Sequence, residues 1–458
     1  MVPRNIFREN DIRGLVDKEI TPELAKQIGA AFGTHVQNYG GREIIVSRDN
    51  RPSSGWIRDS VVAGLTEAGC NVIDIGEMPV PVFYFSLAHL KKNGGVMITG
   101  SHVPKEFNGF KLCIGMKAMV GEEIQEIRRI IEAKRFRHAA KPGAVKVTDV
   151  AENYLSYLRR MMRLKKPLQV VVDAGNAVAG KIGPQALREI GCKVTELYCE
   201  SDGTFPHHFP DPEKPANVKE LVHVVKEKKA DLGIAYDGDG DRLGVVDEKG
   251  RVLFADRFII VVVQDLLKQH PGAKILFDVK CSQMLIDEIK RLGGTPLMWK
   301  TGHALVKKKM KEENAALAVE LSGHIYFSEN FNFDDAIFAS CKLAEVISKS
   351  EKTLSELLNY LPVYYTTTEL LIPCADDKKF VIVEEIKNAF KQRNYNVVDV
   401  DGARVVLENA WGLIRASNTS PNLSLRFEGK TEKEFAFVQK LFEKELDKFG
   451  LKIPQSED

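Results

Sequence analysis

The sequence of 458 residues contains no apolar run long enough to cross a membrane. Its longest run, FIIVVV at 258–263, is followed at once by Gln264 and Asp265, whereas a membrane-spanning helix needs about 20 mostly apolar residues. The opening stretch MVPRNIFRENDIRG carries charges where an export signal needs an apolar segment. We therefore expect a soluble protein with no export signal and no membrane partner.

Paired cysteines are also lacking. The seven cysteines are an odd number, are scattered along the chain and form no C-x-x-C pair. This pattern gives no indication of a disulfide framework or a zinc site. We expect buried, reduced thiols in a cytoplasmic protein. The cysteines are Cys70, Cys113, Cys192, Cys199, Cys281, Cys341 and Cys374.

Net charge is nearly absent, because 65 Lys and Arg residues face 63 Asp and Glu residues and leave a formal charge of +2. Such a balance gives no electrostatic basis for binding nucleic acid or anionic lipid. The hydrophobic content of 44% and the charged content of 28% are those of an ordinary globular protein. Any phosphate-binding chemistry must therefore be local.

A chain of this length predicts three or four domains, at about 100 to 200 residues each. Three segments repeat one layout: an apolar strand, a polar loop, a helix, a glycine-containing turn and a second strand. Their matching turns are AGCNV at 68–72, IGCKV at 190–194 and LGGTP at 292–296. Short apolar runs that alternate with amphipathic helices indicate βαβ units, so we predict three similar α/β domains with mixed, mostly parallel sheets.

The pattern changes from about residue 362. A helix is expected near 377–393, short strands at 396–400 and 403–408 around an Asp-Gly turn, and a closing helix from 431. These elements predict a C-terminal α+β domain. The expected domains are 1–147, 148–250, 251–361 and 362–458.

Polar loops follow the first strand of each repeated unit: SRDNR at 47–51, DAGN at 173–176 and DVKCS at 278–282. In open α/β sheets, ligands bind beyond the carboxyl ends of the strands, where such loops lie. All three can face a binding site, and all three can equally be ordinary strand-to-helix turns.

An acidic loop, DGDGDR, lies between two apolar strands in the stretch 231–247. Its carboxylates at Asp237, Asp239 and Asp241 suit a hard cation such as Mg²⁺ or Ca²⁺, and the intervening glycines let the backbone turn tightly around it. An EF-hand is the alternative, since the three aspartates fit positions 1, 3 and 5 and Glu248 falls at position 12. However, Arg242 occupies position 6, where the EF-hand requires glycine, and the flanking segments are strand-like. An arginine beside carboxylates is better explained by a phosphate that also binds there.

Two further loops carry polar side chains at suggestive spacings. In VELSGHIYF at 319–327, Glu320 and Ser322 point the same way along a strand and suit sugar hydroxyls, while His324 adds a donor or acceptor. A plain polar hairpin explains this stretch equally well. In RASNTSP at 415–421, a guanidinium, two hydroxyls and an amide could hold a phosphate dianion, although such loops are also common turns. These residues are Arg415, Ser417, Asn418 and Thr419.

Two short stretches are ambiguous by themselves. TGH at 301–303 follows the apolar PLMW and is either a helix cap or a ligand. Residues 99–111 read TGSHVPKEFNGFK, whose composition is typical of a turn. On its own, Ser101 is better explained as a turn residue than as a nucleophile.

Taken in order, the loops TGSHVPKEFNGFK, DGDGDR, ELSGH and RASNTSP resemble those of the α-D-phosphohexomutase superfamily, and the resemblance runs along nearly the whole chain. The third and fourth loops look most like those of bacterial phosphomannomutase/phosphoglucomutase enzymes. Phosphoglucosamine mutases, which are also similar, more usually carry a Gly-Thr-Glu-Pro fourth loop. The resemblance implies four domains around a central cleft.

The resemblance further implies the reversible interconversion of hexose 1-phosphate and hexose 6-phosphate through a phosphoserine. One Mg²⁺ per chain and a hexose 1,6-bisphosphate, as activator and intermediate, would be required. Sugar phosphates would be the partners of a cytoplasmic, monomeric enzyme. The implied metal ligands are Ser101, Asp237, Asp239 and Asp241. The implied catalytic residues are Ser101, Arg13, Lys111 and His303. The implied substrate-binding residues are Arg242, Lys280, Thr301, Gly302, His303, Glu320, Ser322, His324, Arg415, Ser417, Asn418 and Thr419.

Several alternatives remain open after this comparison. Either Lys111 or His303 could be the general base that takes the proton of the attacking hydroxyl. Val103 stands where the first loop usually has Asn, and Asn10 stands where an aromatic residue often precedes Asp-Ile-Arg-Gly. The rival functions are a phosphoglucosamine mutase, a metal-dependent sugar phosphatase and a calcium-binding structural protein.

Overall fold

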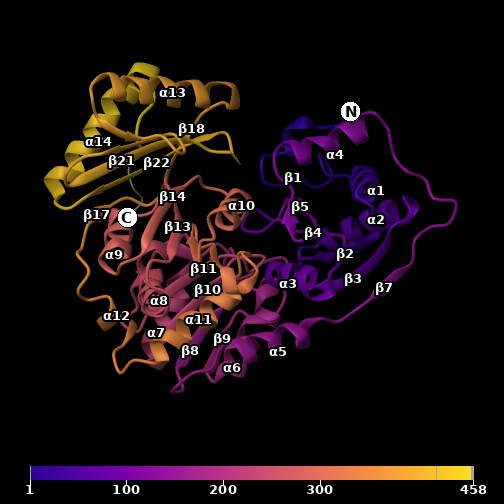
Figure 1. Cartoon of the computed structure of the whole chain (residues 1–458), viewed down its shortest axis with the longest axis horizontal. Helices are drawn as coiled ribbons and strands as arrows, with labels where there is room; N and C mark the ends of the chain where they lie inside the picture. The colour runs from indigo at the N-terminus through magenta and orange to yellow at the C-terminus, as the bar shows by residue number, and fades with distance from the viewer. Residues whose placement is uncertain (1, 419, 455–458) are drawn as a thin grey trace.

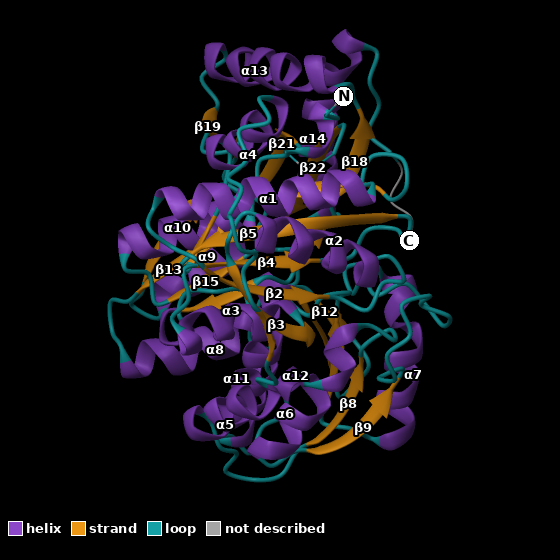
Figure 2. Cartoon of the chain, turned by 90° about the vertical axis from the view of Figure 1, so that its right-hand side faces the viewer, coloured by secondary structure: helices purple, strands orange, loops and turns teal. Residues whose placement is uncertain are grey.

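The computed structural model describes residues 2–418 and 420–454, which form four sheets in four successive parts of the chain (Figure 1). The fourth domain, in yellow, and the first, in indigo, lie on two sides of the molecule above the second and third. Helices cover the sheets, as the turned view shows (Figure 2). Three α/β domains with mixed sheets and a C-terminal α+β domain were predicted, and this fold class is confirmed.

The first domain contains a seven-stranded sheet whose main path runs β1-β5-β4-β2-β3-β7. Strands β4, β2, β3 and β7 are parallel, whereas β5 runs antiparallel to β1 and β4. Ser101 is the third residue after the carboxyl end of β4, on the loop that leads back into β5. The strands are β1 (Ile12–Leu15), β2 (Glu43–Arg48), β3 (Asn71–Glu77), β4 (Gly94–Ile98), β5 (Phe107–Ile114), β6 (Lys117–Ala118) and β7 (Val145–Val147), and the helices are α1 (Pro22–Asn38), α2 (Ser54–Glu67), α3 (Val80–Leu90) and α4 (Glu122–Glu132).

The second domain has a five-stranded sheet of order β12-β11-β10-β8-β9. Strands β10 and β11 form an antiparallel pair, and the acidic loop at 237–242 joins them. The hairpin therefore presents the three aspartates at the end of a buried strand. The elements are α5 (Ala151–Met161), β8 (Gln169–Asp173), α6 (Gly183–Ile190), β9 (Lys193–Leu197), α7 (Lys219–Lys228), β10 (Leu232–Tyr236), β11 (Leu243–Asp247) and β12 (Val252–Leu253).

The third domain has a four-stranded sheet of order β14-β13-β15-β16. Its last two strands are an antiparallel hairpin whose loop is residues 320–324. The elements are α8 (Ala255–Gln269), β13 (Lys274–Asp278), α9 (Gln283–Arg291), β14 (Thr295–Trp299), α10 (His303–Glu313), β15 (Leu317–Val319), β16 (Ile325–Phe327), α11 (Ala336–Ser348) and α12 (Leu354–Leu357). Within this domain β13-α9-β14 is one of the three predicted repeated units; the others are β2-α2-β3 and β8-α6-β9, and each pairs two parallel strands.

The fourth domain is built on an antiparallel sheet with two long helices, as the change of pattern after residue 362 predicts. The loop at 415–421 joins its two longest strands. The elements are β17 (Tyr365–Thr366), β18 (Leu370–Pro373), α13 (Asp376–Gln392), β19 (Asn396–Val398), β20 (Ala403–Val406), β21 (Ala410–Ala416), β22 (Asn422–Gly429) and α14 (Glu432–Leu446). Short 3₁₀ turns elsewhere are Arg4–Ile6, Val178–Lys181, Pro215–Val218, Ser328–Asn330 and Asp447–Phe449.

The hydrophobic cores divide the molecule unevenly. One large cluster joins residues of the first, second and third domains, whereas the fourth domain has a cluster of its own. Polar contacts join the third and fourth domains: Arg404 donates to the carbonyl oxygens of Val279 and Cys281, both at 2.7 Å, and Arg426 pairs with Asp256 at 3.0 Å. A small apolar cluster of Val279, Trp411 and Leu413 also bridges the two domains, so the fourth domain has its own core and is held to the third by polar anchors and one apolar contact.

The structure tests two expectations from composition, one about the cysteines and one about membrane spans. All seven cysteines are free, and six are buried; Cys374 is only half-buried, so the expectation of buried thiols fails at that position. Cys374 follows the edge strand β18, where one side of the chain lies open to solvent. Helix α8 contains the FIIVVV run but has only 15 residues, and no helix in the described part of the chain is long and apolar enough to span a membrane.

Glu369 supplies one of the anchors between the third and fourth domains. It pairs with Lys280 at 2.8 Å and also accepts the hydroxyl of Ser424. Burial raises the pKa of Glu369, but the positive charge of Lys280 outweighs burial and lowers the pKa to about 2. A carboxyl whose pKa is lower in the folded state stabilises the fold at a pH above its unfolded value, and this contribution is lost as the pH falls toward the folded value.

Replacement E369Q is therefore expected to lower the free energy of unfolding most above about pH 5. The difference from the wild-type protein should shrink as the pH falls below about 4.5 toward 2. Urea unfolding at several pH values would measure it. Glu384 pairs with Lys387 on an exposed part of α13, so E384Q is the matched control and should change stability little at any pH. A pH-independent loss in E369Q would contradict the ion-pair account.

Candidate active site

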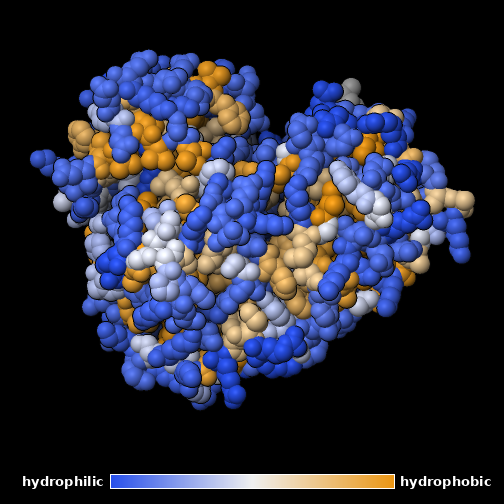
Figure 3. Space-filling view, in the orientation of Figure 1, coloured by the Kyte–Doolittle hydropathy of each residue, from blue (hydrophilic) through white to orange (hydrophobic). Residues whose placement is uncertain are grey.

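Loops from three different sheets meet at one place. The hydroxyl of Ser101, from the first domain, donates to Asp237 Oδ2 of the second at 2.8 Å. Arg242 Nε, at the end of the acidic loop, donates to His324 Nε2 of the third domain at 3.1 Å. The structure thus brings together three of the loops that the sequence singles out. Figure 3 shows that the surface is hollowed between the lobes formed by the fourth and first domains.

The fourth loop is connected to the others through Asp401. This carboxylate accepts a hydrogen bond from Arg415 Nε at 2.9 Å and another from the backbone N–H of Thr301 at 3.1 Å. It therefore couples the loop at 415–421 to the TGH stretch of the third domain. Ser417 is buried and accepts from the hydroxyl of Ser420 at 3.0 Å. Asn418 is partly exposed, and Thr419 lies outside the described residues.

Ser101 is buried to 3% exposure and has a φ of 50°, in the left-handed region that side chains with a Cβ rarely adopt. Its backbone N–H donates to Thr99 Oγ1 at 2.8 Å, and Thr99 in turn donates to Asp239 Oδ2 at 2.9 Å. A strained backbone persists only where its surroundings hold it, and such positions cluster at functional sites. The loop is thus fixed with the hydroxyl of Ser101 against the aspartates.

Arg51 supports the loop that carries Ser101 by binding its backbone carbonyl groups. Its guanidinium donates to the carbonyl oxygens of Ser101 at 2.7 Å and Val103 at 2.6 Å, and also to those of Pro104 and Phe107. Arg51 is 2% exposed and pairs with Asp49. It belongs to SRDNR, one of the loops expected to face a site, but its particular role has no sequence signal, because the groups it binds are main-chain carbonyls.

The contact with Arg51 also accounts for Val103. The carbonyl oxygen of Val103 is what the guanidinium binds, and any residue supplies that oxygen. The departure at this position therefore leaves the loop's support intact. The departure at Asn10 places a buried amide beside Gly302, and Asn10 Oδ1 has no hydrogen-bond partner among the described residues.

Replacement R51K is expected to lower kcat about 10- to 100-fold, the usual range for losing a partner that orients a catalytic group. A lysine has three donors on one nitrogen and cannot reproduce the planar fork that reaches four carbonyls. Steady-state kinetics and urea unfolding would separate this effect from simple destabilisation. Arg48, three residues earlier at the end of β2, pairs with Glu77 and is the matched control. Equal losses in R48K and R51K would argue against a particular role for Arg51.

Three carboxylates form the centre of the site. Asp237, Asp239 and Asp241 are fully buried, and each places an oxygen within 4.8 Å of the others. Asp237 Oδ1 accepts the backbone N–H groups of Gly240, Asp241 and Arg242 at 3.0 to 3.2 Å, which orders the hairpin loop. Asp239 Oδ1 and Asp241 Oδ1 have no hydrogen-bond partner in the described part of the chain.

The electrostatics of the three buried aspartates favour the binding of a cation. Burial raises the pKa of Asp237 well above its ordinary value, and the neighbouring Asp239 and Asp241 raise it further. Lys111 Nζ lies 2.9 Å from Asp239 Oδ2 and also binds Asp241. Arg242 adds a second positive charge but also pairs with Glu213, so the three carboxylates remain undercompensated. Oxygen-only ligands with unpartnered buried carboxylate atoms fit Mg²⁺, so the residues present suit the predicted metal.

The geometry of the acidic loop excludes an EF-hand. The acidic loop joins two antiparallel strands rather than two helices. Glu248, which would be the twelfth ligand, instead accepts from Thr353 at 2.9 Å and from the backbone of Ser355 at 3.2 Å, at the start of α12. Its carboxylate is thus committed to capping a helix.

The TGH stretch acts as a helix start whose backbone also supports the site. His303 is the first residue of α10, and Gly302 precedes it with a φ of 134°. The N–H of Gly302 donates to Glu320 Oε2 at 2.7 Å, and Thr301 Oγ1 donates to Asp278 Oδ2 at 2.9 Å. Glu320 also accepts the hydroxyl of Tyr326. The hairpin loop and the helix start are therefore fixed to one another.

Three further predicted residues occupy buried or partly buried positions. Arg13 is partly buried and pairs with Asp11 at 2.6 Å, but its buried Nε has no partner among the described residues. Lys280 is buried and pairs with Glu369. Ser322 is buried in the same hairpin loop as Glu320 and His324.

Two residues that contact the predicted site residues were not predicted from the sequence. Lys379, on α13, is 2% exposed and donates to the carbonyl oxygens of Ser417 and Ser420, so it shapes the loop at 415–421. Glu213 lies 3.4 Å from Arg242 and balances its charge. Neither has a local signal, since each acts on a loop that is distant in sequence.

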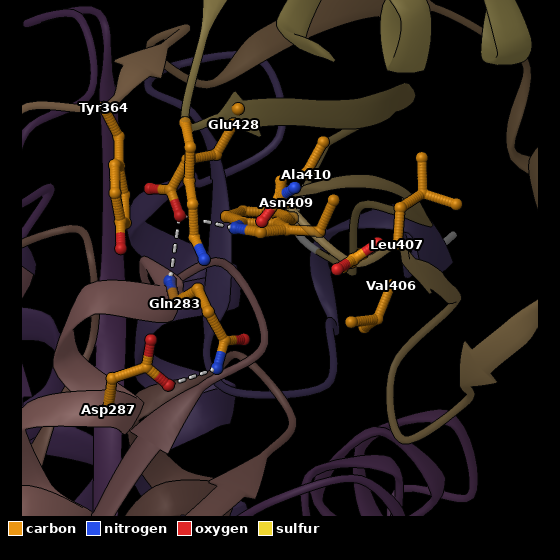
Figure 4. Close-up of a pocket in the computed structure, with 12 residues that line it drawn as sticks. Gln283, Asp287, Tyr364, Val406, Leu407, Asn409, Ala410 and Glu428 are labelled. Atoms are coloured by element: carbon orange, nitrogen blue, oxygen red, sulfur yellow. Dashed lines mark hydrogen bonds between the residues drawn. The ribbon is translucent and has the colours of Figure 1, made fainter.

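A separate pocket lies at the junction of the third and fourth domains (Figure 4). There Glu428 accepts from the indole of Trp411 at 2.7 Å and from the backbone of Gln283 at 3.0 Å. Gln283 also donates to Asp287 at 2.9 Å. None of the residues predicted for the site lines this pocket, so it is a feature of the domain junction.

Four family models match the chain in order. They are described as phosphoglucomutase/phosphomannomutase alpha/beta/alpha domain I at residues 4–138, domain II at 152–250, domain III at 254–365 and the C-terminal domain at 369–445. Together they span nearly the whole chain and include every predicted site residue.

Individual relatives are similar over nearly their full length. A phosphomannomutase/phosphoglucomutase of Pseudomonas aeruginosa is 42% identical over 454 residues, covering 99% of this chain and 98% of the relative. A phosphoglucomutase of Neisseria meningitidis is 40% identical over 96% of each chain. The crystal structure of a phosphoglucomutase/phosphomannomutase family protein from Burkholderia thailandensis has a TM-score of 0.93 and 37% identity, covering 99% of this chain and 100% of that one.

Proposed function

Because the chain belongs to the phosphoglucomutase/phosphomannomutase family of the α-D-phosphohexomutase superfamily, we propose that it interconverts hexose 1-phosphates and hexose 6-phosphates through a phosphoserine at Ser101. The hexose would be mannose, glucose or both. The observation that carries the proposal is the contact of the Ser101 hydroxyl with Asp237 in a cluster of three buried carboxylates. The interconversion of hexose phosphates is the activity of the family, and the assignment of residues is our own.

Phosphoryl transfer needs positioning and charge stabilisation more than a strong nucleophile. Asp237, Asp239 and Asp241, with the oxygen on Ser101, would hold Mg²⁺, which supplies positive charge to the phosphoryl oxygens. Lys111 and Arg13 would add fixed positive charge from other sides. We propose one Mg²⁺ per chain, as the three converging carboxylates support.

In the first half-reaction, a hydroxyl of the sugar monophosphate would attack the phosphorus on Ser101. The new O–P bond forms as the bond to Ser101 Oγ breaks, and the proton that leaves the sugar hydroxyl ends on Ser101 Oγ. The hexose 1,6-bisphosphate would then rotate within the site, so that its other phosphate group faces Ser101. In the second half-reaction Ser101 takes back the other phosphoryl group, and the product carries its phosphate at the opposite end of the hexose.

Arg242, Lys280 and His324 would bind the sugar phosphate, with Glu320 and Ser322 on its hydroxyls. The stretch 301–303 would flank the sugar. The loop at 415–421, shaped by Lys379, would grip the phosphate that is not transferred, in either orientation of the bisphosphate. Closing of the fourth domain would exclude water from the phosphoserine. The separate core and polar anchors of that domain support such a movement.

The electrostatics bear on the two general-base candidates. Burial lowers the pKa of Lys111, but Asp239 and Asp241 outweigh burial and raise the pKa above its ordinary value. Lys111 is therefore better suited to be a fixed charge than a base. His303 has a pKa well below its ordinary value, first because of burial and then because of Lys307, so its ring is neutral, and its role depends on which ring nitrogen carries the proton.

The test is to incubate the protein with Mg²⁺, glucose 1-phosphate and a trace of glucose 1,6-bisphosphate, and to follow the products by ³¹P NMR. Glucose 6-phosphate without inorganic phosphate is the expected result. Release of inorganic phosphate would instead identify a phosphatase, and absence of turnover would leave a metal-binding protein. Comparing kcat/KM for mannose 1-phosphate, glucose 1-phosphate and glucosamine 1-phosphate would then define the sugar. We further propose a cytoplasmic monomer, in line with seven free cysteines.

A further inference from the structure

Helix α10 places a buried lysine one turn after His303. His303 and Lys307 are four residues apart, so their side chains lie on the same face of the helix. Lys307 is 9% exposed, and its ammonium reaches across a domain boundary to Tyr84 on α3 of the first domain. A lysine is rarely buried so deeply without dedicated partners.

The ammonium group of Lys307 has three polar neighbours, one of them an ion-pair partner and two of them hydrogen-bond partners. It forms an ion pair with the fully buried Asp334, with Nζ 2.5 Å from Oδ1. It donates to the hydroxyl of Tyr84 at 2.8 Å, and the Tyr84 ring centroid lies 4.0 Å from Nζ. The third contact is with His303 Nδ1 at 3.4 Å.

This third contact fixes where the proton of His303 lies. An ammonium group only donates hydrogen bonds, so Nδ1 of His303 must accept, and the proton of the neutral ring is then on Nε2. The competing arrangement would have Nδ1–H donate to Asp334, but Oδ2 of Asp334 is 3.8 Å away, beyond hydrogen-bond distance. The ring is 13% exposed, so its other edge is accessible.

We propose that Lys307 is a positioning residue that holds His303 in the tautomer protonated at Nε2, so that His303 presents a hydrogen-bond donor, and not a base, to the sugar phosphate. This inference rests on the proposed function for the substrate, but the tautomer itself follows from the contacts. Asp334 and Tyr84 act through Lys307, by holding its ammonium in place. Of the two histidines in the site, His324 has the opposite arrangement, because its Nε2 accepts from Arg242.

The positive charge of Lys307 argues against a second metal ion beside Asp334. Asp334, His324 and Asp241 have ligand atoms within 4.8 Å of one another. However, Lys307 already neutralises Asp334 at 2.5 Å, and Lys111 binds Asp241. Asp334 is thus shared between Lys307 and His324, whose Nδ1 lies 3.2 Å from Asp334 Oδ2.

The experiment uses the full-length protein with ¹⁵N-labelled histidine side chains. NMR of the wild-type protein is expected to show His303 protonated on Nε2 and unprotonated on Nδ1, identified by the signals lost in H303Q. In the double variant K307M/D334N, which removes the donor while keeping the charge balanced, His303 should lose this single tautomer. Its kcat should fall about 10- to 100-fold with little change in KM. K307M alone keeps the contact of Asp334 with His324 Nδ1 and should lose the tautomer as well, which separates the effect of the lysine from that of the carboxylate.

Two further variants keep the test decisive. K307R retains a cationic donor and is expected to recover part of the lost kcat and the Nε2–H tautomer. K309M removes another lysine of the same helix, one that pairs with Glu313, so it is the matched control and should keep the wild-type tautomer and rate. If K307M/D334N is poorly folded, K307M alone, which should lose the tautomer, and K307R, which should keep it, carry the comparison.

Protonation of His303 on Nδ1 in the wild-type protein would overturn the proposal, and so would an unchanged kcat in folded K307M/D334N. The tautomer is read without turnover. Failure of the proposed function, seen as no isomerisation by the wild-type protein, is thereby distinguishable from failure of this inference.

Discussion

Replacement of Ser101 with alanine is expected to lower kcat by at least about 1,000-fold, because no other group at the site can carry the phosphoryl between half-reactions. Alanine lacks the oxygen that contacts Asp237 at 2.8 Å. The backbone should keep its shape, since Arg51 holds the loop through carbonyl oxygens that alanine also supplies. Alanine and serine bear a similar cost at a φ of 50°. The variant should therefore fold and bind sugar phosphate without isomerising it.

Two measurements check this expectation. ³¹P NMR reports isomerisation, and intact-mass spectrometry after treatment with the bisphosphate reports a phosphoryl adduct on the 99–111 peptide, present in the wild-type protein and absent in S101A. Ser340 is a suitable control, because its hydroxyl is buried on α11 and contacts Tyr236 at 2.6 Å, in a structural role. S340A should lose stability and keep its activity. Wild-type turnover by S101A, or a wild-type protein that never carries phosphate on that peptide, would rule out Ser101 as the carrier.

Replacement D239N is expected to lower kcat/KM at least about 100-fold and to remove the stabilisation that Mg²⁺ gives the wild-type protein. Asp239 contributes charge and an unpartnered buried oxygen to the cluster, and asparagine keeps the shape without the charge. In the absence of metal, the variant relieves repulsion with Asp237 but weakens the buried ion pair with Lys111, so the expected result is the loss of the added stability from Mg²⁺, measured relative to the variant without metal. A ligand that binds only the native state adds about 2.7 kcal/mol at 100 times its Kd.

Thermal unfolding with and without Mg²⁺ would measure this stabilisation, alongside steady-state kinetics. The control is Asp247, which is also fully buried in the second domain, on β11, and pairs with Arg251 at 2.6 Å. D247N should lower stability in both conditions and leave the response to Mg²⁺ intact. If D239N keeps the wild-type response to Mg²⁺, the metal does not bind at these aspartates.

The expected Mg²⁺ ligands illustrate what local sequence can predict. Spacing by two places Asp237, Asp239 and Asp241 on one tight loop between apolar strands, and the structure confirms the hairpin and the convergence of their oxygens. The repeated strand-helix-strand pattern likewise predicts the parallel pairs of the first three domains. These features depend on residues that are neighbours in sequence, so periodicity and composition are sufficient to find them.

The supporting residues could not be found in this way. Arg51 and Lys379 each bind main-chain carbonyls of a loop that lies 38 or more residues away, and carbonyls leave no trace in the sequence. The contact of Lys307 with Tyr84 spans 223 positions and two domains. TGH was ambiguous between a helix cap and a ligand for the same reason, because its partners Asp278, Glu320 and Asp401 come from three other elements.

The sequence by itself determined the α/β architecture, the order of the four loops and the acidic residues that suit a divalent cation. Only the tertiary structure decided which atoms meet: that the hydroxyl of Ser101 lies on Asp237, that Arg242 reaches His324, and that Lys307 binds His303 at Nδ1. The physical reason is one of range. Backbone propensity and hydrophobic periodicity act over a few residues, whereas buried hydrogen bonds and ion pairs are made between whichever distant segments the packed core brings together.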